Sequence, residues 1–117
     1  MKVLICGGRK FSDWVFLSDT LDRIHAERSF TLVMHGAAPG ADTLAESWAA
    51  SRSIKVKRYP ALWASYGRAA GAIRNRVMID HCPDLVIAFE GARGTADMIK
   101  LAEGRSIEVI KTWEKKK

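Results

Sequence analysis

The sequence predicts a single α/β domain, a three-layer sandwich in which helices cover both faces of a five-stranded parallel sheet. Three observations indicate this class: five short apolar runs, helical periodicity between them, and glycine-rich turns where three of the runs end. Strands that alternate with helices form parallel sheets, because right-handed crossovers return the chain in the same direction. A length of 117 residues suits one core. We expect the strand order 3-2-1-4-5.

The first half of the chain contains three predicted strands, at residues 3–6, 31–34 and 54–58. The first two are short unbroken apolar runs, which are typical of strands covered on both faces. The third alternates apolar and basic residues and is therefore expected at an edge. Glycine turns follow the first two strands, with these residues: Gly7, Gly8 and Arg9, and then His35 to Asp42.

Two helices are predicted between these strands. In the first, Ser12 or Asp13 is the expected N-cap. Its apolar face contains Trp14, Leu17, Leu21 and Ile24. In the second, Thr43 and Glu46 have the spacing of a capping box. Its inward residues are expected to be Leu44, Ala45, Trp48 and Ala49.

The second half begins with a long connection, residues 59–71, which we expect to be irregular and to be a candidate lid. Trp63 and Tyr66 could both stack on a base, but aromatic residues in a loop beside a sheet usually complete the core. We therefore expect Trp63 in the core and leave both alternatives open for Tyr66. A helix containing Arg74 to His81 follows. Arg74 and Arg76 must face different ways on it, and the inward one needs a carboxylate or a phosphate, with Asp97, Asp42 and Glu90 as internal candidates.

Residues 84–102 organise the rest of the chain. An apolar strand that ends at Phe89 runs into the turn 90–95, and a helix follows until Gly104. Glycines allow close approach of a ligand, and the first helical amides attract anions. Arg93 could add a charge-assisted bond. The last strand contains Ile107, Val109 and Ile110.

Composition narrows the class of protein. A net charge of +6 suits anionic partners, although Lys115, Lys116 and Lys117 supply part of it. We expect a domain over residues 1–113 and a basic tail over 114–117. No apolar stretch approaches the roughly 20 residues of a membrane span, which predicts a soluble, cytoplasmic protein without membrane partners. Cys6 and Cys82 are expected to be reduced, and His81 with Cys82 lacks the second pair of a zinc site.

The common nucleotide fingerprints are absent. The first loop reads GGRKFS instead of GxGxxG, and His35 stands where a dinucleotide fold has an acid for the ribose. A P-loop motif, GxxxxGK[ST], is also missing. Ordinary dehydrogenase and P-loop chemistry are therefore not expected.

Four separated motifs resemble a known family. They are Gly7 to Arg9, His35 to Asp42, Gly71 to Met78 and Gly91 to Met98. Together they resemble the SLOG superfamily of Rossmann-like domains, which includes the LOG phosphoribohydrolases and the DNA-processing protein DprA. Within it the chain looks most like the YspA-like, cpYpsA-related group. The resemblance implies a nucleotide or nucleotide-derived ligand, such as a nucleoside phosphate or an ADP-ribose-like molecule.

The resemblance also implies which residues meet the ligand. Residues 91–95 would form the phosphate loop, Arg74 and Asn75 would face the phosphate or ribose, and residues 35–42 would line the other wall. The ligand-binding candidates are Gly7, Gly8, Arg9, His35, Gly36, Gly40, Ala41, Asp42, Tyr66, Arg74, Asn75, Gly91, Ala92, Arg93, Gly94 and Thr95. No metal ligands are expected, and no cofactor; magnesium would enter only with a bound nucleotide.

The chain departs from the LOG motif PGGxGTxxE. Glu90 and Ala92 replace its Pro and second Gly, and Met98 replaces the catalytic Glu. Asp97 is adjacent, but an offset of about 100° on a helix would point it elsewhere. Three candidates also have structural interpretations: Asp42 and Thr95 as helix caps, and His35 as a satisfied buried histidine.

Three functions follow. The first is capture of a nucleotide-derived small molecule. The second is hydrolysis of the N-glycosidic bond of a nucleoside monophosphate, with Asp97 or Glu90 as base and Arg74 steadying the phosphate. The third, suggested by the charge and by DprA, is binding of single-stranded DNA. The resemblance further implies a homodimer, for which Trp48 or Trp14 could form the contact.

Overall fold

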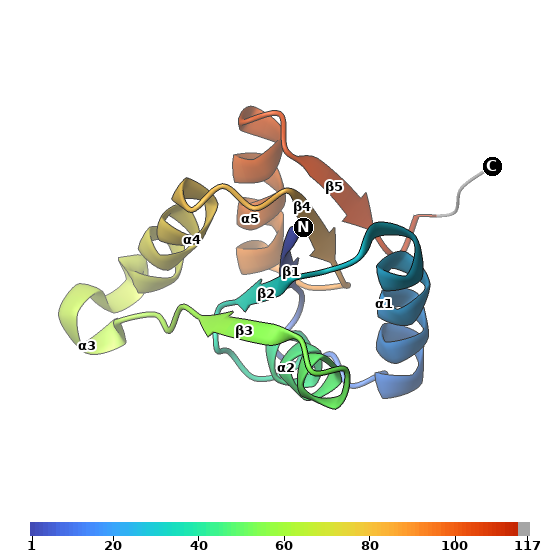
Figure 1. The fold of residues 1–117 in the computed structure, drawn as a ribbon. Helices are drawn as coiled ribbons and strands as arrows, with labels where there is room; N and C mark the ends of the chain where they lie inside the picture. The colour runs from blue at the N-terminus through green and yellow to red at the C-terminus, as the bar shows by residue number, and fades with distance from the viewer. Residues whose placement is uncertain (115–117) are drawn as a thin grey trace.

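A computed structural model describes residues 1–114, so Lys115, Lys116 and Lys117 of the predicted basic tail lie outside the described residues. The five strands form one parallel sheet in the order β3-β2-β1-β4-β5, as predicted. Figure 1 shows how the helices surround this sheet. The strands are β1 (Lys2–Cys6), β2 (Leu32–His35), β3 (Lys55–Arg58), β4 (Leu85–Ala88) and β5 (Glu108–Lys111). The helices are α1 (Trp14–Arg28), α2 (Ala41–Ser51), α3 (Trp63–Tyr66), α4 (Ala70–Asp80) and α5 (Arg93–Gly104), with a 3-10 turn, η1 (Gly67–Ala69).

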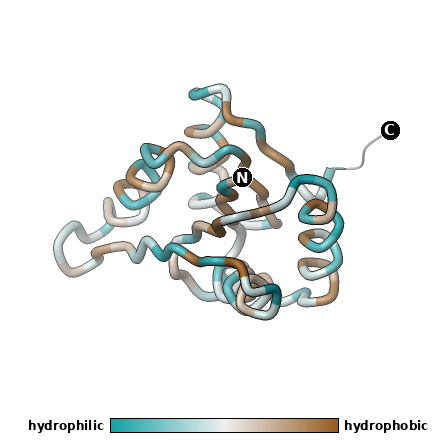
Figure 2. The backbone as a smooth tube through the Cα atoms, viewed as in Figure 1, coloured by the Kyte–Doolittle hydropathy of each residue, from teal (hydrophilic) through white to brown (hydrophobic). Residues whose placement is uncertain are grey.

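Alternate residues of the central strands supply two cores, one on each face of the sheet. Val3 and Ile5 of β1 pack with α1 and α2, whereas Leu4 and Cys6 pack with α4 and α5. In Figure 2, brown, hydrophobic segments run along these strands. Because both faces are covered, the central strands contain apolar residues throughout. The predicted three layers are therefore confirmed, as is the edge position of β3.

The first helix begins where the sequence indicates. Of the two expected caps, Asp13 is the one that acts: its Oδ1 accepts from the amide of Phe16 at 3.1 Å. Leu17, Leu21 and Ile24 are buried as predicted, but Trp14 is 39% exposed. The prediction for Trp14 is wrong because it occupies the first helical position, where the helix emerges from the β1–α1 loop beyond the edge of the core.

The expected capping box of α2 does not form. The helix begins two residues earlier, at Ala41, so Thr43 lies inside the first turn and its hydroxyl donates to the carbonyl of Ala38 at 3.0 Å. Glu46 instead binds His35 and Arg58. Trp48 is fully buried and its indole donates to Asp22 at 2.9 Å. It therefore cannot form the dimer contact that the resemblance suggested for it.

Residues 59–71 differ most from the prediction. The segment expected to be irregular contains α3 and η1, and α4 begins at Ala70, four residues before Arg74. Gly67, with φ of +54°, separates α3 from the turn that leads into α4. Trp63 is 48% exposed and does not complete the core. The prediction failed because α3 lies at the far end of α4, beyond the sheet that would have buried the indole ring (Figure 1).

The last helix also starts earlier than expected. It begins at Arg93, so Gly94 and Thr95 belong to its first turn and Thr95 is not its cap. Ala92 is the N-cap residue and supplies no side-chain hydrogen bond. The turn that follows β4 is consequently shorter than the predicted one. Within residues 1–114, no helix has the length and apolar character that crossing a bilayer requires.

Candidate ligand-binding cavity

The three glycine turns meet at the carboxyl edge of the sheet. The amide of Gly8 donates to the carbonyl of Glu90 at 2.9 Å, and the amide of Ala41 donates to the carbonyl of Gly8 at 3.1 Å. Turns that follow β1, β2 and β4 are therefore joined by backbone hydrogen bonds. They gather on one rim, at the edge where open parallel sheets bind ligands.

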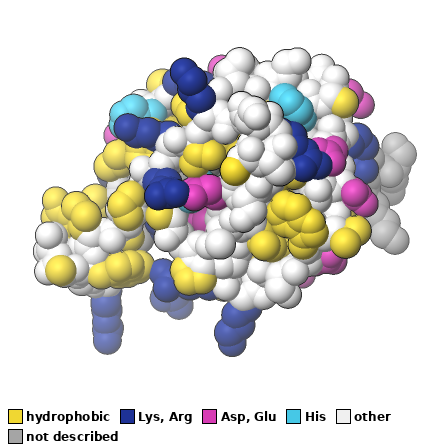
Figure 3. Space-filling model, turned by 60° about the horizontal axis from the view of Figure 1, so that its bottom comes forward, with side chains coloured by type: hydrophobic (Ala, Val, Ile, Leu, Met, Phe, Trp, Pro, Cys, Tyr) yellow, Lys and Arg dark blue, Asp and Glu magenta, His cyan; other side chains and the backbone are white. Residues whose placement is uncertain are grey.

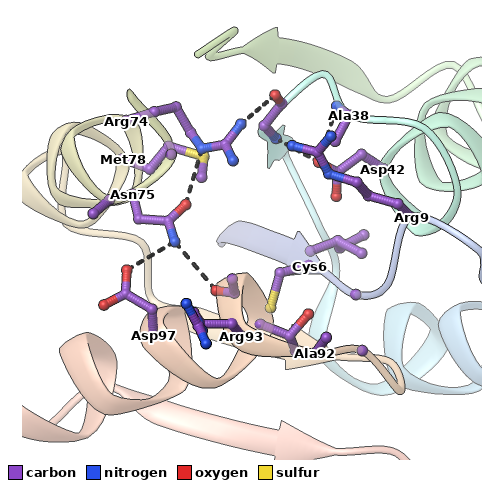
Figure 4. A pocket seen from close by; sticks show the side chains of 18 of the residues that line it. Cys6, Arg9, Ala38, Asp42, Arg74, Asn75, Met78, Ala92, Arg93 and Asp97 are labelled. Carbon is purple, nitrogen blue, oxygen red and sulfur yellow. Dashed lines mark hydrogen bonds between the residues drawn. The ribbon is translucent and has the colours of Figure 1, made fainter. Parts of the chain in front are cut away.

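A cavity of about 790 Å³ opens between these turns, α3, α4 and α5. This volume falls within the roughly 300–1,000 Å³ of small-molecule sites. Its charged lining residues are five cations and two carboxylates: Arg9, Lys10, Arg68, Arg74, Arg93, Asp42 and Asp97. Figure 4 shows several of these side chains pointing toward one another from α4, α5 and the loops. The excess of positive charge favours an anionic ligand.

Asn75 connects the two walls of the cavity. It is buried on α4, and its Nδ2 donates to the carbonyl of Gly94 at 3.2 Å and to Oδ2 of Asp97 at 3.0 Å. Its Oδ1 accepts from Nε of Arg74 at 2.9 Å. One amide group thus fixes the first turn of α5 and aligns a guanidinium beside it (Figure 4).

Arg74 is the inward arginine of α4, whereas Arg76 is exposed. The Nη1 of Arg74 donates to the carbonyl of Gly36, at the end of β2. Burial lowers the pKa of Arg74, and the charge of Asp42 opposes this effect. The side chain keeps further N–H groups for a ligand, since a guanidinium has five donors.

Asp42 is a buried carboxylate that shapes the β2–α2 loop. Its Oδ2 accepts from the amides of Gly36 and Ala38, at 3.1 and 3.2 Å. Burial raises its pKa, while the hydrogen bond from Ala38 and the charge of Arg74 oppose that rise. Asp42 does not cap α2 as an N-cap residue would, because it accepts from the preceding loop. Its charge also contributes, after burial, to the raised pKa of Cys6.

The first turn of α5 forms the opposite wall. Gly91, Ala92, Arg93, Gly94 and Thr95 all line the cavity. A Cβ on Gly91 would lie 2.1 Å from Oγ1 of Thr95 and 2.7 Å from the amide nitrogen of Gly8, so only glycine fits this crossing. The unpaired amides of a helical first turn and its dipole favour a bound anion here.

Asp97 lines the cavity, contrary to the expectation that it points elsewhere. Met98, at the position of the missing glutamate, is instead buried in the core with Ala102. The helix packs its Met98 face against the sheet, and this leaves its Asp97 face toward α4. Asp97 consequently binds Asn75 at the cavity wall.

His35 lies behind the cavity rather than in it. Its Nδ1 accepts from the amide of Ala37 at 2.9 Å, so the proton is on Nε2, which donates to Glu46 at 2.8 Å. Arg58 binds the same carboxylate. These residues surround a separate hollow of about 300 Å³. His35 therefore has the satisfied, buried environment of its structural interpretation and supports the loop that carries Gly36.

The structure places the other candidate residues as follows. Twelve of the residues proposed from the sequence line the cavity: Gly7, Arg9, Gly36, Asp42, Arg74, Asn75, Gly91, Ala92, Arg93, Gly94, Thr95 and Asp97. Gly8, Gly40 and Ala41 support it through backbone contacts. Tyr66 and Glu90 are exposed, and the cavity lining does not include them.

Several lining residues escaped the sequence analysis. Lys10, Trp63, Arg68 and Cys6 all face the cavity. Lys10 follows a glycine turn, and Cys6 ends β1, so their positions at the ligand edge were available signals. Trp63 was weighed as a residue that could stack on a base but was expected in the core, and Arg68 was not singled out; the placement of both depends on the path of α3. The remaining members are Ile5, Ala38, Gly71, Ala72 and Met78.

The fold and cavity define a class: a Rossmann-like α/β domain with a cavity, lined mostly by cationic charged residues, at the carboxyl edge of its sheet. Residues 1–66 match the model of the YspA, cpYpsA-related SLOG family. The chain is also 32% identical over 122 residues to the Gene 61 protein of Mycobacterium phage D29, covering 97% of this chain and 98% of that protein. The chain belongs to the YspA, cpYpsA-related SLOG family, as its four motifs predicted.

Proposed function

We propose that this protein binds a nucleotide or a nucleotide-derived ligand in the cavity, with a phosphate at the first turn of α5. The observation that carries the proposal is the shared placement of that turn and five cationic side chains around one cavity. Membership of the SLOG family agrees with this class of ligand. The ligand is a small molecule, and magnesium enters only as its companion.

The energetics favour phosphate at this position. A helix dipole contributes about 0.3–1 kcal/mol to a bound anion, and up to about 2 kcal/mol in partly buried sites. A hydrogen bond to a charged group adds about 1.5–3 kcal/mol. Arg74 is held in place by Gly36 and Asn75 before any ligand arrives, so little side-chain entropy is lost on binding.

Calorimetry with nucleoside monophosphates, ADP-ribose and ribose 5-phosphate tests this proposal. Arg74→Ala should weaken the tightest ligand roughly 10- to 100-fold, because one charge-assisted bond is lost. The matched control is Arg76→Ala, two residues away on α4 but exposed. It should leave the affinity unchanged. Absence of binding to every ligand by the folded protein, or an equal loss in both variants, would contradict the proposal.

Hydrolysis of the N-glycosidic bond is a second candidate, favoured by the position of Asp97. This carboxylate lines the cavity and uses one oxygen for Asn75, which leaves the other to accept a proton from water. The water would attack the anomeric carbon of the ribose while the nucleobase leaves. Glu90, the alternative base, is exposed and does not line the cavity.

Chromatography of nucleoside monophosphates after incubation with the protein decides between binding and hydrolysis. If Asp97 is the general base, free nucleobase and ribose 5-phosphate should appear. Asp97→Asn should then reduce their rate of formation at least 100-fold. Glu103→Gln removes an exposed carboxylate from the same helix and serves as the control. Unchanged substrates at high protein concentration would remove the enzymatic hypothesis and leave the binding function intact.

A further inference from the structure

Trp63 is an exposed tryptophan on the wall of a charged cavity. Its side chain is 48% exposed, whereas Trp48 in the core is fully buried. Exposed large apolar side chains are common near α3 and α4, where Figure 3 shows hydrophobic residues gathered at the left of the view. Among these, Trp63 is the one that lines the cavity: Leu62, Tyr66, Ile73 and Val77 do not.

The Trp63 ring already lies against one planar group, the guanidinium of Arg9. The guanidinium carbon of Arg9 lies 5.3 Å from the ring centroid, within the range of cation–π contacts. Gly71 lies beside the ring edge, and a Cβ there would stand 3.5 Å from Cη2, in ordinary contact. Arg9 comes from the β1–α1 loop and Trp63 from α3, so two separate segments form this flat wall.

The first turn of α5 and Asp97 form another wall of the same cavity. A phosphate or a sugar phosphate alone would leave much of a 790 Å³ cavity unfilled. A ligand whose phosphate lies at α5 and whose other end is flat and aromatic would use both walls. Bases stack well on tryptophan rings and on arginine guanidinium planes.

We infer that Trp63 and Arg9 form a stacking subsite for the base of the ligand, which selects nucleotides over sugar phosphates. The inference rests on the proposed function, because the phosphate at α5 sets the position of the base. Asp97 lines the same cavity and uses one carboxylate oxygen for Asn75, so its other oxygen could accept a hydrogen bond from a ribose hydroxyl. The subsite accepts any base, since stacking uses the ring face rather than its edge.

The test compares AMP with ribose 5-phosphate, which lacks the base, in wild type, Trp63→Ala and Trp63→Phe. Wild type should bind AMP roughly 5- to 100-fold more tightly than ribose 5-phosphate. Trp63→Ala should bring the two affinities within about twofold by weakening AMP only, and Trp63→Phe should retain most of the preference. Trp113→Ala, at a tryptophan that is 41% exposed and outside the cavity lining, is the control and should retain all of it.

The outcomes separate the two proposals. Equal affinities of wild type for AMP and ribose 5-phosphate would overturn the stacking subsite while the phosphate site stands. A preference for AMP that survives in Trp63→Ala would also overturn it. If neither ligand binds to the folded wild type, the proposed function and the subsite both fail.

Discussion

Asn75 holds several parts of the cavity wall together through its side-chain amide. It is 5% exposed and uses its amide for three partners on two elements, Arg74, Gly94 and Asp97. Asp42 has a similar role in the β2–α2 loop, where it accepts two backbone amides. Buried polar groups of this kind are costly unless satisfied, so each network has essentially one arrangement. At the scale of single residues, the site is held in place before a ligand binds.

Glu46 makes a testable contribution to stability at low pH. The hydrogen bond from Arg58 is the main cause that lowers the pKa of Glu46 to about 2 from its ordinary value of 4.5, and His35 adds to it. A carboxylate whose pKa is lower in the folded than in the unfolded chain stabilises the fold when it is ionised. This stabilisation is complete above pH 4.5 and is lost as the pH falls toward 2. The advantage of wild type over Glu46→Gln should therefore be constant above about pH 5.

That advantage should shrink between about pH 4.5 and 2, as measured by urea unfolding of both proteins across this range. Glu90→Gln, at an exposed carboxylate, is the control for general effects of charge removal. A difference between wild type and Glu46→Gln that stays constant down to pH 2.5 would show that the Arg58 and His35 contacts do not stabilise the folded chain.

At the scale of helices and strands, the cavity residues are positioned where the loops that connect these elements cross one another closely. The β4–α5 turn passes over the β1–α1 loop at Gly91, and the β2–α2 loop passes it at Gly40, whose φ is +83°. A side chain on Gly40 would lie 2.2 Å from the carbonyl oxygen of Gly8. Glycine at both positions is thus required by other backbone segments. These crossings bring three strand ends together around one cavity.

Two glycines of the same turn should respond to alanine in opposite ways. Gly91→Ala should lower the free energy of unfolding by about 1–3 kcal/mol, because its Cβ would meet the backbone of Gly8. Gly94→Ala should raise it by about 0.5–1 kcal/mol, since no atom lies within 4 Å of its Cβ and alanine favours a helix. Urea denaturation measures both, and destabilisation of similar size in the two variants would contradict the crossing.

On the scale of the whole molecule, one group of cationic side chains gathers around the cavity. Arg9, Arg68, Arg74 and Arg93 line the same hollow, whereas Arg28, Arg52 and Arg58 are paired with carboxylates elsewhere. Under the proposed function, the cavity cations would meet the phosphates of one small ligand. An extended nucleic acid would instead require a continuous basic track.

Salt dependence distinguishes these partners. Affinity for single-stranded DNA should be weak and should fall by less than about tenfold between 50 and 200 mM salt, because few phosphates can reach the cavity cations together. Fluorescence anisotropy with a labelled oligonucleotide measures this, with AMP calorimetry at the same salt concentrations as the reference. A loss of about 10³-fold or more would indicate several phosphate contacts and favour the DNA-binding hypothesis.

The local sequence pattern was sufficient to predict an element where one physical signal dominated. The apolar runs of β1, β2 and β4, the cap at Asp13 and the glycine turns could all be read from short stretches of sequence. The turns then had to meet, because the carboxyl ends of parallel strands share an edge. The spacing predicted that Arg74 and Arg76 face different ways, and the family resemblance indicated that Arg74 is the inward one. The fold class and much of the site followed from these few features.

The local sequence pattern failed to predict side-chain positions that tertiary packing decides. Asp97 was expected to point elsewhere, but the packing of α5 against the sheet buries Met98 and leaves Asp97 toward α4. Trp63 was expected in the core, but the path of α3 carries it beyond the sheet. His35 faces Glu46 because Glu46 is on the inward side of α2 rather than at a cap.

The sequence by itself determined the order and type of the main elements, the parallel sheet and the edge at which ligands bind, because hydrophobic periodicity and glycine turns act over a few residues. Only the tertiary structure decided which side chains share the cavity. That choice depends on helix rotation and on backbone crossings between segments such as Gly8 and Gly91, which are distant in the chain. Contacts between segments so far apart in the sequence leave no pattern within any short stretch of it.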